Sequence, residues 1–143
     1  MTPQQRAERS AQAMWAGDHA SKWLGASLDA VGPGTAVMSM SVATHHLNGQ
    51  QICHGGYIFT LADSAFAFAC NSYNTKVVAQ HNTISYLSPV QEGERLTATA
   101  QEVSRAGRSG LYDVTVTGAD GRQVALFRGA SRQIKGQHFE EEA

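Results

Sequence analysis

The longest apolar stretch of the chain is "HGGYIFTLADSAFAFAC", residues 54–70, and it contains a single carboxylate, Asp63. Between its tyrosine and its last cysteine, the only other polar side chains are two hydroxyls, those of Thr60 and Ser64. A helix with this composition is hydrophobic almost all the way round, and such helices are buried. The pattern therefore predicts a buried central helix over about residues 55–71.

Alternation with a period of two dominates most of the remaining chain. It is clear in "TAVMSMSVAT", residues 35–44, and the Gly-Pro-Gly bend at 32–34 predicts another strand just before it. A short helix is expected over residues 3 to about 18, which are rich in Gln, Ala, Glu and Arg. Four consecutive hairpin-like strands are expected after the central helix, in "KVVAQHNTISYLSP", "ERLTATAQEVSRAG", "GLYDVTVTGADG" and "RQVALFRGASRQI".

One long buried helix among five or six antiparallel strands is an α+β arrangement in which the sheet wraps around the helix. Such a sheet also leaves an edge strand that needs a partner or a cover. Pairing between two copies of the chain is one way to supply it, so the strand pattern already points to a dimer.

Composition and charge exclude several classes of function. With 143 residues, 42% hydrophobic and 16% charged, the chain is typical of one soluble globular domain. The net charge is −1 and the cations are scattered, so a nucleic-acid partner is not expected. No apolar run approaches the roughly 18 residues that span a bilayer, and the polar N-terminus lacks the apolar core of a signal peptide. We therefore expect a cytoplasmic protein with no membrane partner.

Asp63 needs a specific explanation, because a buried carboxylate is costly unless it is paired or hydrogen-bonded. No Lys or Arg occurs between residues 46 and 75. Two interpretations remain open at this point. Asp63 is either a solvent-facing or locally hydrogen-bonded residue, or an acid/base or nucleophilic group whose pKa is set by its surroundings.

The sequence His54-Gly55-Gly56 lies at the predicted start of the same helix. Backbone N–H groups there have no intrahelical partner, and the helix dipole places partial positive charge at that end. Glycine lets a ligand carbonyl come close to the backbone, so Gly55 is a candidate donor to a developing oxyanion. A Gly-Gly pair at a helix start is also common for turn geometry alone.

Gly55 and Asp63 are about 12 Å apart along a helix with a rise of about 1.5 Å per residue. An oxyanion donor and a base that act on one carbonyl must both lie within roughly 3 Å of the reacting atoms. One helix therefore cannot supply both groups to the same site. If two copies of the helix pack antiparallel across a two-fold axis, Gly55 of one copy meets Asp63 of the other. We expect a homodimer with two shared active sites.

Four segments together resemble a known family: "LNGQQICHGGYIFTLADSAFAFACNSYN", "LSPVQEGERLTATAQEV", "GLYDVTVT" and "VALFRGASRQI". From about residue 20 to 135 the chain is similar to the hotdog-fold acyl-CoA thioesterases of the PaaI type, which are associated with phenylacetate degradation. The resemblance implies a single hotdog domain over residues 1–143, no cofactor, and a dimer that pairs into a homotetramer. It also implies hydrolysis of phenylacetyl-CoA, or of a hydroxylated phenylacetyl-CoA, to the free acid and CoA.

The same resemblance assigns roles to individual residues. The family's catalytic carboxylate falls on Asp63, as base or nucleophile, and its oxyanion glycine falls on Gly55. His54 and Asn48 match the motif histidine and the loop asparagine, which are expected to position the water or the carbonyl.

Two further residues are expected to contact the substrate, Gly56 and Ser64. Ser64 follows the aspartate at a position where family members often have threonine, so the hydroxyl is retained. The acidic end of the chain, residues 137–143, is expected to be a disordered tail.

Two other functions stay open beside hydrolysis. A hotdog dehydratase or hydratase acting on acyl thioesters uses a histidine and an acid in one site, which His54 and Asp63 could supply. A non-catalytic acyl-CoA-binding protein is the third possibility, although binding alone does not need a buried carboxylate.

Cysteine and histidine chemistry is less favoured. Cys53 lies beside His54, but adjacent side chains rarely point at one another, and Cys53 and Cys70 suggest no disulfide framework. His45, His46 and His54 have no second cluster with ligand spacing, so no metal site is predicted.

Two sets of side chains have both a binding and a structural interpretation. An acyl pocket or simply the core would explain the aromatic residues Tyr57, Phe59, Phe66 and Tyr73. CoA phosphates or a solvated strand face would explain the cations Arg105, Arg108, Arg128, Arg132 and Lys135.

Overall fold

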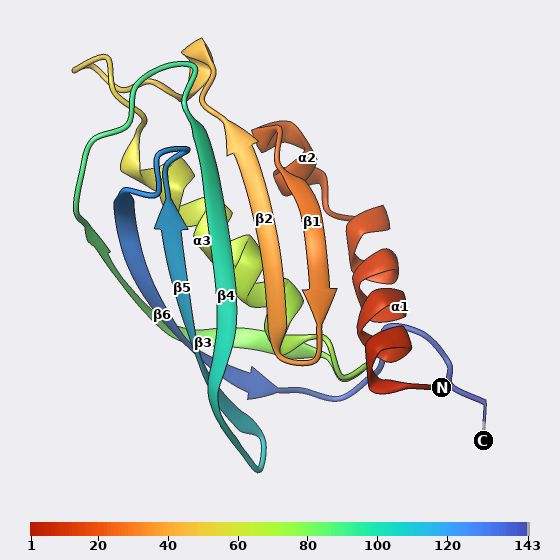
Figure 1. Cartoon of the computed structure of the whole chain (residues 1–143). Helices are drawn as coiled ribbons and strands as arrows, with labels where there is room; N and C mark the ends of the chain where they lie inside the picture. Colours follow the sequence, from red (N-terminus) through yellow and green to blue (C-terminus); the bar gives the residue numbers. More distant parts are fainter. Residues whose placement is uncertain (143) are drawn as a thin grey trace.

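A computed structural model describes residues 1–142, in which an antiparallel sheet of six strands curves around one long helix, α3 (Figure 1). Helix α3 spans Gly55–Cys70, as the apolar stretch predicts. The α+β prediction is confirmed. In chain order the elements are α1 (Pro3–Ala16), α2 (His19–Leu24), β1 (Ser27–Gly32), β2 (Thr35–Ser41), a 3-10 turn η1 (Thr44–His46), α3, β3 (Val77–Tyr86), β4 (Arg95–Ala106), β5 (Ser109–Thr117) and β6 (Gln123–Gln133).

The strand order in the sheet is β1-β2-β4-β5-β6-β3, and every neighbouring pair is antiparallel. The prediction of four consecutive hairpin-like strands is therefore wrong for β3, which pairs with β6 instead of β4. The segment after β3 explains the difference, because Val42 at the end of β2 exchanges backbone hydrogen bonds with Gly93 and Glu94. That contact starts β4 beside β2 and leaves β3 at one edge of the sheet.

One face of α3 packs into the concave side of the sheet. Its members are all buried: Ile58, Leu61, Ala62, Ala65 and Ala69. Alternating residues of β2 and β4 meet them, and these are also buried: Ala36, Met38 and Met40 on β2, and Leu96, Ala98 and Ala100 on β4. Each large apolar side chain removed from water in this way contributes roughly 1.5–3 kcal/mol before the entropy of ordering is subtracted.

Helix α3 also approaches β6 so closely that one strand position must be glycine. A Cβ atom on Gly129 would lie 2.8 Å from the ring of Phe66. The ring of Phe66 packs in turn against Tyr112 and Phe127. The core interpretation therefore holds for Phe66.

The N-terminal region contains a second helix that the sequence pattern did not predict. Helix α1 begins with a capping box between Thr2 and Gln5 and ends at Ala16. Asp18 then caps a new helix, α2, by accepting the backbone N–H of Ser21 at 3.0 Å. Because α2 has only six residues, it is too short to show a clear helical period in the sequence.

The acidic C-terminal segment, residues 137–142, contacts the body of the protein in this structure. The side chain of Asn74 bonds the backbone of His138 and Phe139. Glu141 forms an ion pair with Arg6 of α1 at 2.6 Å. These contacts join regions far apart in the sequence, which local composition does not reveal.

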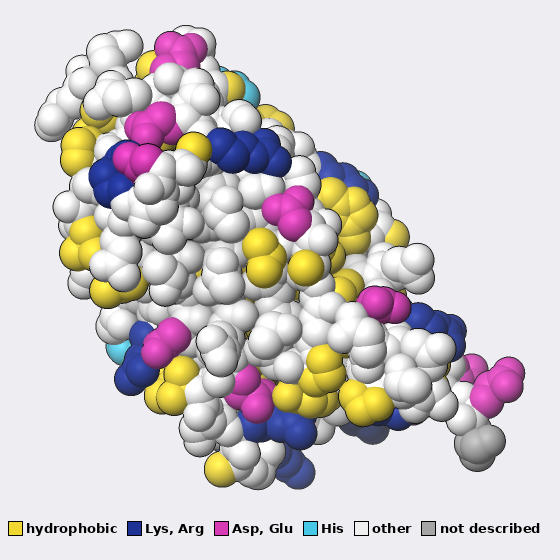
Figure 2. All heavy atoms as spheres, in the orientation of Figure 1, with side chains coloured by type: hydrophobic (Ala, Val, Ile, Leu, Met, Phe, Trp, Pro, Cys, Tyr) yellow, Lys and Arg dark blue, Asp and Glu magenta, His cyan; other side chains and the backbone are white. Residues whose placement is uncertain are grey.

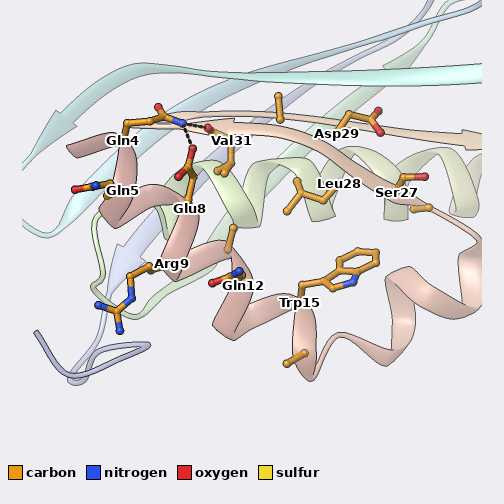
Figure 3. A pocket seen from close by; sticks show the side chains of 14 residues that line it. Gln4, Gln5, Glu8, Arg9, Gln12, Trp15, Ser27, Leu28, Asp29 and Val31 are labelled. Carbon is orange, nitrogen blue, oxygen red and sulfur yellow. Dashed lines mark hydrogen bonds between the residues drawn. The ribbon is translucent and has the colours of Figure 1, made fainter. Parts of the chain in front are cut away.

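A groove of about 1080 Å³ lies between α1 and β1 (Figure 3). Trp15 and Leu28 line it, and Gln4 closes one end by donating to the carbonyl of Val31 at 2.8 Å. None of the predicted site residues lines this groove. On the face shown in Figure 2, cationic and anionic side chains are interspersed. No helix within residues 1–142 is long and apolar enough to cross a membrane.

Candidate active site

The start of α3 presents one backbone N–H group that has no partner in the described chain. His54 caps the helix, and its Nδ1 atom accepts the N–H of Gly56 at 2.9 Å. The N–H groups of Tyr57 and Ile58 bond back to the carbonyl of His54. The N–H of Gly55 makes no hydrogen bond within residues 1–142, so it is free to bind an acceptor at the positive end of the helix dipole.

Tyr86, which no sequence motif marks, fixes the peptide that follows this donor. Its hydroxyl donates to the carbonyl oxygen of Gly55 at 2.9 Å. The ring lies so close that a Cβ atom on Gly55 would be 3.1 Å from the Tyr86 Cζ. Tyr86 comes from the end of β3, 31 residues further along the chain, so no local motif indicated this contact.

Asn48 organises the loop that leads into α3. Its side-chain oxygen accepts the N–H of Gln50 at 2.9 Å, and its backbone N–H donates to the carbonyl of Ile52 at 2.8 Å. Leu47 and Cys53 then form an isolated antiparallel bridge that delivers His54 to the helix start. The Asn48 amide nitrogen makes no hydrogen bond within the described chain, and it remains available as a donor.

Asp63 is half-buried on the side of α3 that faces β3. Its Oδ1 atom accepts a hydrogen bond from the Nδ2 of Asn82 at 3.3 Å. Burial raises the pKa of the Asp63 carboxyl above its ordinary value, and the Asn82 hydrogen bond opposes that shift. Asp63 is thus locally hydrogen-bonded, and its pKa is higher than that of an ordinary surface aspartate.

Gly55 and Asp63 both lie beside the edge strand, but at different points along it. Gly55 contacts Tyr86 and Asp63 contacts Asn82, four residues earlier on β3. This separation is about 13 Å along an extended strand, close to the 12 Å expected along the helix. Within one chain the two groups therefore do not converge.

The two residues expected to contact substrate are engaged inside the protein. The N–H of Gly56 is bonded to His54. The hydroxyl of Ser64 lies 3.1 Å from that of Ser21, whose own oxygen is 2.6 Å from a carboxylate oxygen of Asp18. Because Ser21 has one proton and Asp18 can only accept, the proton between the two serines must come from Ser64. In this arrangement Ser64 joins α3 to α2.

The alternative nucleophile and the histidine cluster have structural roles in this fold. Cys53 is buried, and burial raises the pKa of its thiol to about 11, which disfavours the reactive thiolate. His46 is buried, and its Nδ1 atom accepts the N–H of Ala43 at 2.9 Å. The Nδ1 atom of His54 caps α3. The Nδ1 atoms of His46 and His54 are therefore both bonded within the protein and do not face a ligand.

A polar pocket of about 530 Å³ lies near the C-terminal end of α3, and three of its lining residues are Arg6, Arg105 and Arg108. The guanidinium of Arg105 stacks 3.4 Å above the ring centre of Tyr73. Tyr73 lies in this pocket, whereas Phe59 packs on Phe127 and Tyr57 packs near His46. The four aromatic residues considered for an acyl pocket therefore do not line one cavity.

Only part of the predicted cationic set converges on this pocket. Arg128 projects from β6 and is bonded twice to Asp113 of β5, at 2.6 and 2.8 Å. Both side chains are about half exposed, which fits the solvated strand face for this residue.

The chain is similar to several known proteins. Residues 50–125 match the family model of the Thioesterase superfamily. The chain is 44% identical to the "Acyl-coenzyme A thioesterase PaaI" of Escherichia coli K12 over 131 residues, covering 92% of this chain and 94% of the relative.

Solved structures extend the likeness to the whole fold. The Escherichia coli PaaI protein superimposes with a TM-score of 0.93 at 42% identity, covering 95% of this chain and 99% of that one. A Streptococcus mutans protein solved with bound acetyl CoA gives a TM-score of 0.75 at 25% identity, covering 78% and 90%. The predicted hotdog fold is confirmed by these likenesses.

Asp63→Asn is expected to stabilise the folded protein at neutral pH. The folded state raises the pKa of Asp63, so it binds this proton more tightly than the unfolded chain does. Wild-type stability therefore falls as pH rises from the ordinary aspartate value, about 3.9, through the raised one. Asparagine carries no such cost. Urea unfolding of both proteins across pH should show a higher midpoint for the variant at neutral pH and a shrinking difference in acid.

Asp113→Asn is the matched control with the opposite sign, because Arg128 lowers the pKa of Asp113. This variant should be slightly less stable than wild type at neutral pH, with the difference lost in acid. A lower midpoint for Asp63→Asn at neutral pH would contradict the claim that burial disfavours the Asp63 charge.

Proposed function

The chain belongs to the thioesterase superfamily and is an acyl-CoA thioesterase of the PaaI type, and from this premise we propose its substrates and its catalytic groups. The substrates are phenylacetyl-CoA or hydroxylated phenylacetyl-CoA, which are hydrolysed to the free acid and CoA. The Escherichia coli relative is described as a protein "from the phenylacetic acid degradation operon", which supports an arylacetyl group. Asp63 is the base or nucleophile, and the Gly55 N–H stabilises the oxyanion.

One observation carries this assignment: the free Gly55 N–H and the half-buried Asp63 lie beside the same unpaired strand edge. Strand β3 is ten residues long and pairs only with β6 in the described chain. An exposed edge of this length is usually paired or covered in native proteins. The proposed cover is the β3 strand of a second copy.

Antiparallel pairing of two β3 strands brings the separated groups together. Gly55 lies by Tyr86 and Asp63 by Asn82 on β3. A two-fold axis midway between these positions, near Ile84, would set Tyr86 of one copy opposite Asn82 of the other. Each Gly55 donor would then lie next to the Asp63 carboxylate of the other copy. The proposal is a homodimer with two shared sites, and two such dimers form the tetramer.

The chemistry follows from these two groups. The thioester carbonyl oxygen accepts the Gly55 N–H, which polarises the carbon. The oxygen of a water molecule, or of Asp63 itself, attacks that carbon and forms the new C–O bond. In both routes the C–S bond then breaks, and the CoA thiolate leaves with the electron pair and is later protonated. In the water route Asp63 takes the proton that the water loses. In the direct route a water molecule then hydrolyses the acyl-aspartate anhydride, which releases the free acid and restores Asp63. A thiolate leaves readily, so the site needs no strong acid.

Asn48 and His54 take supporting roles in this proposal. The amide nitrogen of Asn48 is the free donor of the loop that precedes α3, so it is placed to hold the carbonyl or the water. His54 acts mainly through its cap, because its Nδ1 atom is occupied by Gly56.

The CoA phosphates are proposed to lie at the polar pocket near the end of α3. Arginine is suited to phosphate oxygens, and Arg105 and Arg108 are two of the cations considered from the sequence. Arg105 is held in place by Tyr73. Tyr73 and Tyr112 both donate to Glu102 at 2.9 Å, so the pocket wall is fixed before a ligand enters.

Asp63→Asn is expected to reduce kcat by about 100-fold or more, because it removes the proton acceptor or nucleophile and keeps the shape. Thiol release from phenylacetyl-, hydroxyphenylacetyl-, benzoyl- and straight-chain acyl-CoA, followed with a thiol-reactive dye, measures the effect and the preference. Wild type should favour the arylacetyl substrates. Near-normal turnover by the variant would remove Asp63 from the chemistry, and no turnover by wild type on any substrate would contradict the proposed function.

Gly55→Pro is expected to lower kcat by about 100-fold, because it deletes the proposed oxyanion donor. Proline is well tolerated at the first position of a helix, and His54 has the extended backbone that precedes proline, with φ −61° and ψ 131°. Gly55→Ala is the matched control. It brings a Cβ atom equally close to Tyr86 but keeps the N–H, so its loss should stay within about ten-fold. Equal losses in the two variants, with helix content retained in circular dichroism, would contradict the donor role.

A further inference from the structure

The carboxamide of Asn82 occupies a position that the sequence did not mark as functional. Asn82 lies in the middle of β3, opposite Gly129 of β6. Its side chain turns toward α3, where its Nδ2 donates to Asp63. The residue opposite it has no side chain, and the ring of Phe66 fills the space above that glycine. Asn82 is therefore the side chain of the sheet that reaches the proposed catalytic carboxylate.

The other end of this carboxamide is unsatisfied. A carboxylate only accepts hydrogen bonds, so the NH₂ end of Asn82 must face Asp63 and the Oδ1 atom must point elsewhere. That oxygen is buried and has no hydrogen-bond partner in the described part of the chain. Buried polar atoms are nearly always paired, so an exception beside a functional group marks a place for a bound donor.

The charged groups around Asp63 do not replace this interaction. On β3, His81 is exposed and pairs in register with Ala130 of β6. On β6, Arg128 is bound to Asp113. On α3, Cys70 is buried, and the nearby Asp63 contributes to raising the pKa of its thiol. Within residues 1–142, Asn82 makes the only side-chain hydrogen bond to Asp63.

We propose that Asn82 is a second component of the catalytic centre, which orients Asp63 through its Nδ2 and holds the hydrolytic water through its Oδ1. This inference rests on the proposed thioesterase function and selects the water route from the two routes open to Asp63. A water molecule donates one proton to the Asp63 carboxylate and the other to the Asn82 oxygen. Its lone pair is then free to attack the thioester carbon, and Asp63 receives the proton that the water loses.

Two substitutions separate the donor from the acceptor. Asn82→Leu removes both at similar volume, whereas Asn82→Asp removes the donor, keeps an acceptor and adds a like charge. Loss of the donor leaves burial of Asp63 unopposed, so both variants should move the acid limb of the kcat profile to higher pH. Only Asn82→Leu also loses the acceptor. Its kcat plateau at high pH should therefore stay below that of wild type by about ten-fold or more, whereas the plateau of Asn82→Asp should not.

The experiment measures kcat and KM for phenylacetyl-CoA across pH about 5 to 9, with melting temperature and oligomeric state recorded for each protein. Gln101→Leu is the matched control, since Gln101 is an exposed amide residue of β4, away from the proposed β3 interface, and should leave the profile unchanged. A uniform loss with an unmoved acid limb would show that Asn82 only packs. An Asn82→Leu plateau equal to wild type would remove the water contact.

The same assay separates failure of this inference from failure of the proposed function. If wild type and Gln101→Leu release no thiol from any acyl-CoA, the function itself fails. If both proteins are active and the Asn82 variants have the same acid limb and the same high-pH plateau of kcat, the thioesterase function stands and the proposed role of Asn82 is overturned.

Discussion

Enclosure of an almost wholly apolar helix inside a curved sheet is the constraint on which the rest of this structure depends. Helix α3 buries its apolar face against β2, β4 and β5. Two parts of α3 stay outside this apolar contact, its N-terminal end and the side that faces β3. Gly55 occupies the first place and Asp63 the second. The packing that stabilises the fold thus also separates the two proposed catalytic groups along one strand.

The electrostatics of the site follow from the same enclosure. Burial disfavours the charged form of Asp63, and in the described chain one amide hydrogen bond opposes it. The start of α3 has the opposite character, with a free N–H at the positive end of the helix dipole. In the proposed dimer the carboxylate of one copy faces the helix start of the other, so each group meets its electrostatic complement. A surface-exposed aspartate would have neither the shifted pKa nor this partner.

The sequence was sufficient for the elements with strong periodicity and insufficient for contacts that join distant segments. The bounds of α3 and its buried face could be read from the apolar run, and the inward residues of β2 and β4 from their alternation. The position of Asn82 could not be predicted in this way. A bulge between Ala79 and His81 breaks the two-residue period of β3, so the sequence does not show which residue faces the helix. Tyr86 and the Ser64–Ser21 contact depend on tertiary packing. The position of β3 beside β6 depends on where the chain crosses after Tyr86, which local turn residues do not specify.

The central claim, that each site takes its oxyanion donor from one copy and its carboxylate from the other, is tested most directly with mixed subunits. Asp63→Asn and Gly55→Pro chains carrying different affinity tags are co-expressed, and oligomers that carry both tags are isolated, a population that includes mixed dimers. Each mixed dimer contains one intact site and one doubly altered site, so the thiol release of these oligomers should rise well above that of both parent variants, toward half of the wild-type rate. Mixed dimers no more active than the two parent variants would contradict the shared site.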